Sequence, residues 1–496
     1  MHNPLFRRVI LSVVLVTAGL TTASAAELSP QQARQLAIEA YTEAAKQGDA
    51  EARFKLGWLY QQGEWLARDL KAAASWYLMA AEQGESAAQY NLALLMLAGE
   101  GMPRDVGKGL NWLNKAAELG LASAQLKLAE LLDAGQLMPQ DSAQAARWVK
   151  RAADGGDPVA QNNLALRHFD GKGVEVDPAQ GVQWLIRAAE AEHATAQANL
   201  GQIYMDGLHG VSVDLPLAAK WLERAAKQGS AVAQYRLALL NEKGLGLPRD
   251  LVAAQQWLEK AAQAGEIAAA THLGLGFENG VFGAADPIKA AQWYGVAAKG
   301  GSALARNNLG VMYREGRGVA QDFNLAKQWF AQAAEQAEPL AWINLGLMAE
   351  HGQGGAKDET AAQAWYAKAA EKGLPKAQGR LGWLHFKAGR YPEALAWITR
   401  AAEGGDVSAQ NNLGVIYEQG KGAKKDFAQA ARWYRKAAEA GDKYAQNNLA
   451  VLLRDGIGVE RNLPDAITWF KRSAEQGYVK ARLNLAQMYE RMGSGK

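Results

Sequence analysis

Residues 408–441 read SAQNNLGVIYEQGKGAKKDFAQAARWYRKAAEAG, and this stretch contains the pattern that decides the fold. Ala409, Leu413 and Tyr417 are spaced four residues apart, which places them on one face of a helix. A Gly-Lys-Gly sequence follows, and glycine readily takes the left-handed conformation that ends a helix. Asp426 then precedes a second apolar stripe, where an Asp caps a helix N-terminus. The stretch therefore predicts two amphipathic helices joined by a Gly-rich connection.

The same pattern recurs along the chain, and the tryptophan of the second stripe marks each copy. The marker tryptophans are Trp76, Trp112, Trp148, Trp184, Trp221, Trp257, Trp293, Trp329, Trp365, Trp397, Trp433 and Trp469. They are 36 or 37 residues apart, except for one step of 32 that ends at Trp397. Each first stripe is marked by a leucine with an alanine four residues before it, as in Ala409 and Leu413. A fixed period of this length indicates stacked supersecondary units, so we predict one elongated array of about 13 helix pairs.

The N-terminus has the layout of a secretory signal peptide. Arg7 and Arg8 precede the apolar run 9–20, and small residues follow at 23–26. We predict that residues 1–26 are removed by cleavage near Ala25 or Ala26, which leaves no integral membrane segment. An uncleaved anchor is the alternative, but the run is shorter than the roughly 20 apolar residues that a spanning helix needs. The chain has no Asn-x-Ser/Thr acceptor, so we predict a bacterial protein that is periplasmic or secreted.

Composition restricts the chemistry that the chain can perform. The 496 residues include no cysteine, which excludes disulfides, thiolate nucleophiles and cysteine-based zinc sites. The formal net charge of +3 gives no electrostatic signature of nucleic-acid binding. The seven histidines include no pair with the spacing of a helical metal site. We therefore predict no cofactor, no metal, no nucleic-acid partner and no enzyme activity.

The pattern Ala-x-x-Asn-Leu-Gly-x-x-Tyr-x-x-Gly-x-Gly, followed by Asp and then by Trp-Tyr-x-x-Ala-Ala, resembles the Sel1-like repeat. That family is related to the tetratricopeptide repeat. The resemblance implies an all-α fold, a right-handed α–α superhelical solenoid of about 13 Sel1-like helix pairs. We place the solenoid at residues 27–490 and a disordered tail at 491–496. The unit of 32 residues looks like a plain tetratricopeptide repeat. Glu192 and Ala337 stand where sister units have a closing glycine.

The resemblance also implies a function. Such proteins act as adaptors and scaffolds, which predicts a non-enzymatic protein–protein interaction scaffold that binds a protein or peptide partner on its concave face. The alternative is an enzyme that acts on cell-wall or β-lactam material, of the type linked to a cysteine-rich branch of the family. Because this chain has no cysteine, it departs from that branch.

An asparagine series is the first candidate for the binding site. It lies one residue before the marker leucine and comprises Asn91, Asn163, Asn199, Asn308, Asn344, Asn412, Asn448 and Asn484. A carboxamide both donates and accepts hydrogen bonds, so it can pair with a peptide backbone whatever the side chains of the peptide are. One such group per repeat would form a ladder for an extended peptide. The alternative is that each Asn satisfies a backbone group of the neighbouring repeat.

Two tryptophans off the marker series are the second candidate. Trp58 and Trp383 each lie two residues after a marker leucine, at a position that can face the concave side. Aromatic anchors dominate the energetics of many interfaces, so both residues are candidate binding residues. The alternative is that they fill the core.

Overall fold

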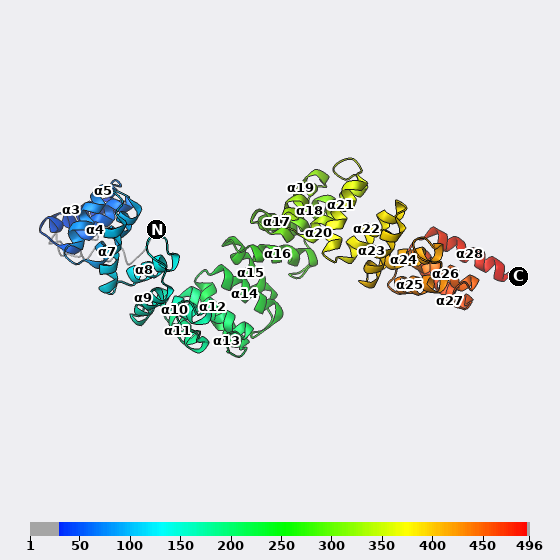
Figure 1. Cartoon of the computed structure of the whole chain (residues 1–496), viewed down its shortest axis with the longest axis horizontal. Coiled ribbons are helices and arrows are strands. Elements are labelled where there is room, and N and C mark those ends of the chain that lie inside the picture. The colour runs from blue at the N-terminus through cyan, green and yellow to red at the C-terminus, as the bar shows by residue number, and fades with distance from the viewer. Residues whose placement is uncertain (1–28, 494–496) are drawn as a thin grey trace. The chain divides into compact units, whose positions relative to one another are not determined.

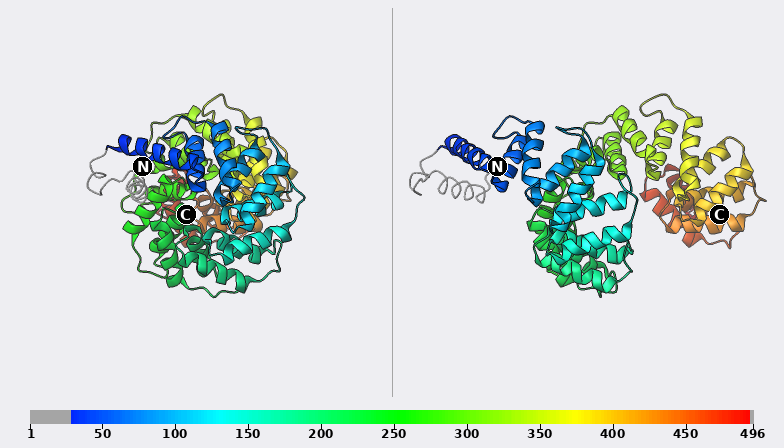
Figure 2. Two further views of the ribbon diagram at one scale, coloured as in Figure 1. Left: turned by 90° about the vertical axis from the view of Figure 1, so that its left-hand side faces the viewer. Right: turned by 60° about the vertical axis from the view of Figure 1, so that its left-hand side comes forward.

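The computed structural model describes residues 29–493, and this range forms 26 helices and no strand. The chain divides into two compact units, Met1–Asp250 and Leu251–Lys496. The predicted all-α solenoid of about 13 helix pairs is confirmed by this helix content and by the stacking of successive helices within each unit (Figure 1; Figure 2). The predicted signal peptide, residues 1–26, lies outside the described residues.

The first unit begins with a lone helix that packs on the first complete pair. Its helices are α3 (Pro30–Lys46), α4 (Ala50–Gln62), α5 (Leu70–Ala81), α6 (Ser86–Ala98), α7 (Val106–Glu118), α8 (Ala122–Ala134), α9 (Ser142–Asp154), α10 (Pro158–Asp170), α11 (Pro178–Glu190), α12 (Ala194–Asp206), α13 (Leu215–Lys227) and α14 (Ala231–Lys243).

The second unit continues the alternation of first and second helices. Its helices are α15 (Leu251–Gln263), α16 (Ile267–Asn279), α17 (Pro287–Lys299), α18 (Ala303–Glu315), α19 (Phe323–Glu335), α20 (Pro339–His351), α21 (Glu359–Glu371), α22 (Pro375–Lys387), α23 (Tyr391–Glu403), α24 (Val407–Gln419), α25 (Phe427–Glu439), α26 (Lys443–Asp455), α27 (Leu463–Glu475) and α28 (Val479–Gly493). Residues 491–493, predicted as part of a disordered tail, thus continue the last helix, and residues 494–496 lie outside the described range.

Local capping explains why the helices begin and end at these residues. The first helix α24 is followed by its C-cap residue Gly420, which has a φ of 71°. The second helix α25 begins after Asp426, whose carboxylate accepts a hydrogen bond from the amide of Gln429 at 2.9 Å. The next first helix begins after Asp442, which accepts from the amide of Ala445 at 2.6 Å. These caps satisfy amide and carbonyl groups that a helix terminus leaves without a partner.

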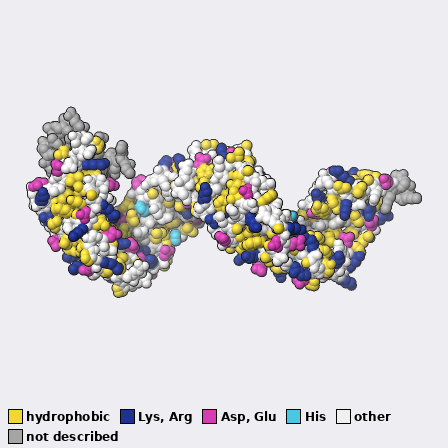
Figure 3. Space-filling view, turned by 90° about the horizontal axis from the view of Figure 1, so that it is seen from above, with side chains coloured by type: hydrophobic (Ala, Val, Ile, Leu, Met, Phe, Trp, Pro, Cys, Tyr) yellow, Lys and Arg dark blue, Asp and Glu magenta, His cyan; other side chains and the backbone are white. Residues whose placement is uncertain are grey.

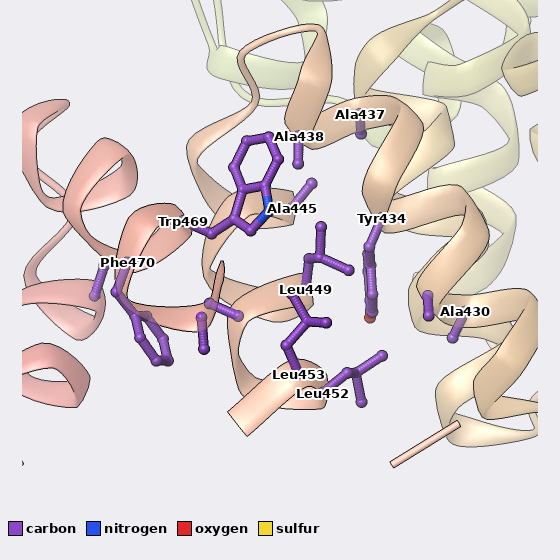
Figure 4. Packing of buried hydrophobic residues seen from close by; sticks show 14 of the residues in the cluster. Ala430, Tyr434, Ala437, Ala438, Ala445, Leu449, Leu452, Leu453, Trp469 and Phe470 are labelled. Atoms are coloured by element: carbon purple, nitrogen blue, oxygen red, sulfur yellow. The ribbon is translucent and has the colours of Figure 1, made fainter. Parts of the chain in front are cut away.

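The core of each unit is built from the marker alanines and leucines. Ala445 and Leu449 of α26 are fully buried, and Leu449 lies between Tyr434 and Trp469, which come from the second helices on either side of it (Figure 4). The alanine keeps this face of the first helix small, so neighbouring helices approach closely. Packing therefore runs from each helix to its sequence neighbours within a unit.

The marker tryptophans also have a structural role. Most of these tryptophans are half-buried. In nine repeats, the side chain of a Lys or Arg three residues later on the same helix lies over the tryptophan ring. The cation lies 4.1–5.4 Å from the ring centroid at Lys115, Arg151, Arg187, Arg224, Lys260, Lys368, Arg400, Lys436 and Arg472. Each of these cations also lies in the last turn of its helix, where positive charge is favoured by the helix dipole.

The two residues predicted to replace a closing glycine take the glycine conformation. Glu192 has a φ of 60° and Ala337 a φ of 58°. A residue with a Cβ atom is destabilised in this left-handed conformation, whereas glycine is not. The short unit differs in its connection, because only residues 388–390 join α22 to α23, whereas residues 420–426 join α24 to α25.

Candidate partner-binding surface

All eight candidate asparagines lie on first helices and are half-buried. Four of them donate a hydrogen bond from Nδ2 to the Oδ1 atom of another Asn in the preceding repeat. The pairs are Asn199 with Asn162 at 3.1 Å, Asn344 with Asn307 at 2.8 Å, Asn448 with Asn411 at 3.2 Å, and Asn484 with Asn447 at 2.9 Å. These four residues therefore bind a neighbouring repeat, and they bind a side chain rather than a backbone group.

The residue two places before the marker leucine decides which asparagines are paired. Where the preceding repeat has an Asn at that position, the pair forms. The preceding repeats of Asn91, Asn163, Asn308 and Asn412 have other residues there, namely Phe54, Leu126, Thr271 and Gly379. Asn91 lies beside the hydroxyl of Tyr77, and Asn308 beside that of Tyr294. Within residues 29–493, the carboxamides of Asn163 and Asn412 make no side-chain hydrogen bond.

The sequence contains the signal for this division. The paired asparagines accompany an Asn-Asn dipeptide in the preceding repeat, at 162–163, 307–308, 411–412 and 447–448. Only the second Asn of each dipeptide was predicted as a candidate, although the first Asn supplies the acceptor. Asn162, Asn307 and Asn447 are buried, with exposed fractions of 3–6%, as expected for acceptors inside an interface between repeats.

Asn344 belongs to a larger polar network in the second unit. Its Oδ1 atom accepts a hydrogen bond from Arg314 at 2.8 Å, and Arg314 also pairs with Glu315 at 2.7 Å. Arg317 then joins Glu315 to Glu278 through two contacts of 2.8 Å. Because these residues come from successive repeats, removal of Asn344 would disturb the packing between repeats as well as any bound ligand.

Glu278 extends the network to a buried tyrosine. Its carboxylate accepts from the hydroxyl of Tyr294 at 2.6 Å. Burial raises the pKa of Tyr294 well above its ordinary value, and the neighbouring Glu278 raises it further. The same pairing recurs as Tyr366 with Glu350 at 2.8 Å and Tyr434 with Glu418 at 2.5 Å. These hydroxyls stay protonated and act as structural donors.

Apolar side chains flank the asparagines on the same helix face. In α10, Val159, Asn163 and Leu166 are separated by four and three residues, so they form one stripe. Val159 is 43% exposed and Leu166 is 41% exposed, although both are apolar. In α20 and α26 the corresponding flanking pairs are Leu340 with Leu347 and Tyr444 with Val451. These three first helices thus present an apolar–carboxamide–apolar surface.

Trp58 and Trp383 are both half-buried. Trp58 packs against the buried cluster that contains Leu56. Trp383 packs against the cluster around Ile398 and stacks on Phe386, with ring centroids 5.1 Å apart and an interplanar angle of 8°. Each ring therefore fills part of the core and also reaches the surface.

Three further properties of the described residues concern surface charge, metal ligands and membrane-spanning helices. On the face shown in Figure 3, basic and acidic side chains are interspersed. Within residues 29–493, no cluster of three or more His, Asp or Glu residues could hold a metal ion. In the same range, no helix is long and apolar enough to cross a membrane.

Comparisons with known proteins agree with this architecture. A family model described as the Sel1 repeat matches the chain twelve times. The matched segments are residues 50–85, 86–121, 122–157, 158–193, 194–230, 231–266, 267–302, 303–338, 340–374, 375–406, 407–442 and 443–478. A search of curated proteins found no significant match.

Solved structures provide further relatives. The crystal structure of c5321, described as a protective antigen of uropathogenic Escherichia coli with an SLR fold, is 33% identical. That match covers 84% of this chain and 90% of c5321, with a TM-score of 0.79. A Sel1 repeat protein from Oxalobacter formigenes is 32% identical over 69% of this chain and 89% of its own, with a TM-score of 0.41. The chain belongs to the Sel1 repeat family.

Proposed function

We propose that this protein is a non-enzymatic scaffold that binds an extended segment of a protein partner along its first helices. The observation that carries the proposal is that the carboxamides of Asn163 and Asn412 each make no side-chain hydrogen bond within residues 29–493. Sister asparagines use the same group to bind a neighbouring repeat. An extended backbone offers both a donor and an acceptor to such a group. The exposed apolar residues Val159 and Leu166 supply contact area beside Asn163.

Membership of the Sel1 repeat family supports the same proposal, because members of this family typically serve as protein-interaction scaffolds. A solenoid builds a long surface from short repeats, so a partner can contact many equivalent positions along one line. We also propose that residues 1–26 direct export and that the mature protein acts in the periplasm or outside the cell. Fractionation of cells, with N-terminal sequencing of the exported form, tests this part.

Site-specific photocrosslinking tests the binding surface. A photoreactive amino acid replaces Leu166 on first helix α10 or, as a control, the exposed Gln183 on second helix α11. After irradiation in the envelope fraction, we expect a discrete crosslinked partner from position 166 and none from position 183. The same partner from both positions, or from neither, would contradict binding along the first helices.

A second measurement separates binding from folding. The variant Asn163→Ala should reduce the crosslinked product from position 166 several-fold and leave the melting temperature unchanged. Asn199→Ala is the matched control. Because its carboxamide donates to Asn162, this substitution should lower the melting temperature instead. Unchanged crosslinking in the Asn163→Ala variant would remove this carboxamide from the proposed site.

A further inference from the structure

One first helix differs in charge from its neighbours. On α22, Lys376, Arg380, Trp383 and Lys387 are exposed or half-buried, and their intervals of four, three and four residues keep them on one side of the helix. We call these four residues the basic face of α22. The corresponding residues are Leu340, Asn344, Leu347 and His351 in α20, and Ser408, Asn412, Val415 and Gln419 in α24. A charged surface thus lies in the repeat between two largely neutral ones.

Two acids lie beside this face, and each of them also has a structural partner inside the protein. Glu350 lies 3.6 Å from Arg380 and 3.8 Å from Lys387, but its side chain is only 11% exposed and accepts a hydrogen bond from Tyr366. Asp406 interacts with Arg380 and Lys376 while it caps α24 by accepting from the amide of Ala409 at 2.7 Å. By contrast, the side chains of Arg380 and Lys387 are 41% and 43% exposed. The positive charge therefore faces solvent and the negative charge faces the protein.

A cluster of aromatic rings adjoins the basic face. Trp383 stacks on Phe386, and Phe386 meets Tyr391 edge to face, with centroids 5.4 Å apart. The ammonium group of Lys421 lies 5.9 Å from the centroids of both Phe386 and Tyr391. Because only residues 388–390 separate α22 from α23, these rings come together at a tight turn. The aromatic cluster and the cations thus form one continuous surface at the short repeat.

We propose that the basic face of α22, with its aromatic cluster, binds an acidic stretch of the partner segment that carries an aromatic side chain. Carboxylates would pair with Arg380 and Lys387, and the aromatic side chain would contact Trp383. This inference rests on the proposed function, since the segment lies along the first helices. The neutral faces of α20 and α24 accept many sequences, so the charged face between them sets the register of the bound segment.

Binding of synthetic peptides to the purified protein tests the proposal. The probe is a fluorescein-labelled peptide with the sequence Gly-Asp-Glu-Phe-Glu-Asp-Gly, and its anisotropy reports binding. The control probe, Gly-Asn-Gln-Phe-Gln-Asn-Gly, keeps the ring and removes the charge. We expect saturable binding of the acidic probe, at least about tenfold tighter than the control, that weakens as salt is added. Equal affinity for both probes, or no binding of the acidic probe, would overturn the proposal.

Variants locate the site. Arg380→Gln with Lys387→Gln should weaken binding of the acidic probe about tenfold. Trp383→Leu should also weaken it, and this substitution keeps an apolar side chain like Leu347 of the preceding repeat. The charge-matched control, Arg432→Gln with Lys471→Gln, alters exposed second-helix positions and should have no effect. Equal weakening by the control variant would overturn the assignment, as would stronger binding to phosphatidylglycerol vesicles than to the peptide.

The two proposals fail separately. The photocrosslinking experiment at position 166 probes α10 in the first unit and involves neither charge nor the basic face of α22. A crosslinked partner there, with no preference for the acidic probe, would retain the scaffold function and reject only the acidic recognition.

Discussion

Two repeats fill the space between their helices in opposite ways. In the repeat 407–442, the ring of Tyr434 comes from second helix α25 and packs on Gly414 of first helix α24. A Cβ atom on Gly414 would lie 2.5 Å from carbon atoms of this ring. In residues 158–193, first helix α10 supplies Phe169, and second helix α11 has Gly181 beneath it, where a Cβ atom would lie 2.4 Å from the ring. Each ring thus requires a glycine on the facing helix. One pair of helices therefore accommodates a ring from either side.

The identity of the fifth residue after the marker leucine depends on which helix supplies the ring. In the repeat with Tyr434, that residue is Glu418, which accepts the hydrogen bond of the tyrosine hydroxyl. In the other repeat, that residue is Phe169 itself, and the residue at the tyrosine position is the buried Leu185. A buried hydroxyl needs an acceptor, whereas an aliphatic side chain needs only apolar contact. Similar backbones therefore carry coupled sets of side chains.

The largest effect should come from closing the space under the ring. Gly414→Ala forces a Cβ atom against Tyr434 and should lower the free energy of unfolding by about 2–3 kcal/mol, a typical cost of overpacking. Gly295→Ala in the middle of α17 is the control, since a Cβ there meets no atom within 4 Å. Alanine there should stabilise by about 0.5–1 kcal/mol. Urea unfolding followed by circular dichroism measures both, and a Gly414→Ala variant as stable as the parent would contradict the packing argument.

A smaller effect should come from the hydroxyl of the same ring. Tyr434→Phe leaves the Glu418 carboxylate without its donor and should cost about 1–2 kcal/mol. Adding Glu418→Leu changes that position to an apolar residue, as in the repeat with Phe169, and should recover part of the loss. Thermal melts of the single and double variants measure the recovery. A double variant less stable than Tyr434→Phe alone would show that Glu418 stabilises the repeat independently of the tyrosine.

The smallest effect should come from the caps that close the two repeats. Helix α12 is capped by the Nδ1 atom of His193, which accepts from the amide of Ala196 at 3.2 Å, whereas Asp442 caps α26. Burial lowers the pKa of His193, so the folded state favours the neutral ring that can accept this hydrogen bond. Unfolded histidine binds protons more readily, so this contribution is present above a pH of about 6.5 and is lost as the pH falls below that value.

We therefore expect His193→Ser to remove part of the acid sensitivity. Between pH 7.5 and 5 the parent should lose about 0.5–1 kcal/mol more than the variant, the typical value of an N-cap. Melting temperatures of both proteins across this range measure the difference. An identical pH dependence would mean that the protonation of His193 does not affect folding.

Much of the fold was predictable because its signals are local. The marker leucines and tryptophans, the glycines that end first helices and the aspartates that begin second helices each act within a few residues. Glu192 and Ala337 were identified as glycine replacements from spacing alone, and both take the left-handed conformation. The candidate asparagines were also identified. Which of them bind an Asn of the preceding repeat was not predicted, because each such pair joins residues 37 positions apart.

The sequence by itself determined the repeat, the helix pairs and the absence of cysteine chemistry, since periodicity and composition need no neighbours. Only the tertiary structure decided that Asn199 binds Asn162 while Asn163 makes no side-chain hydrogen bond within residues 29–493, and that Arg380 faces solvent while Glu350 is largely buried. The physical reason is that a hydrogen bond or an exposed charge depends on which side chain the stacking of repeats brings within a few ångströms. Packing between helices sets that distance, so the sequence of a single repeat does not determine it.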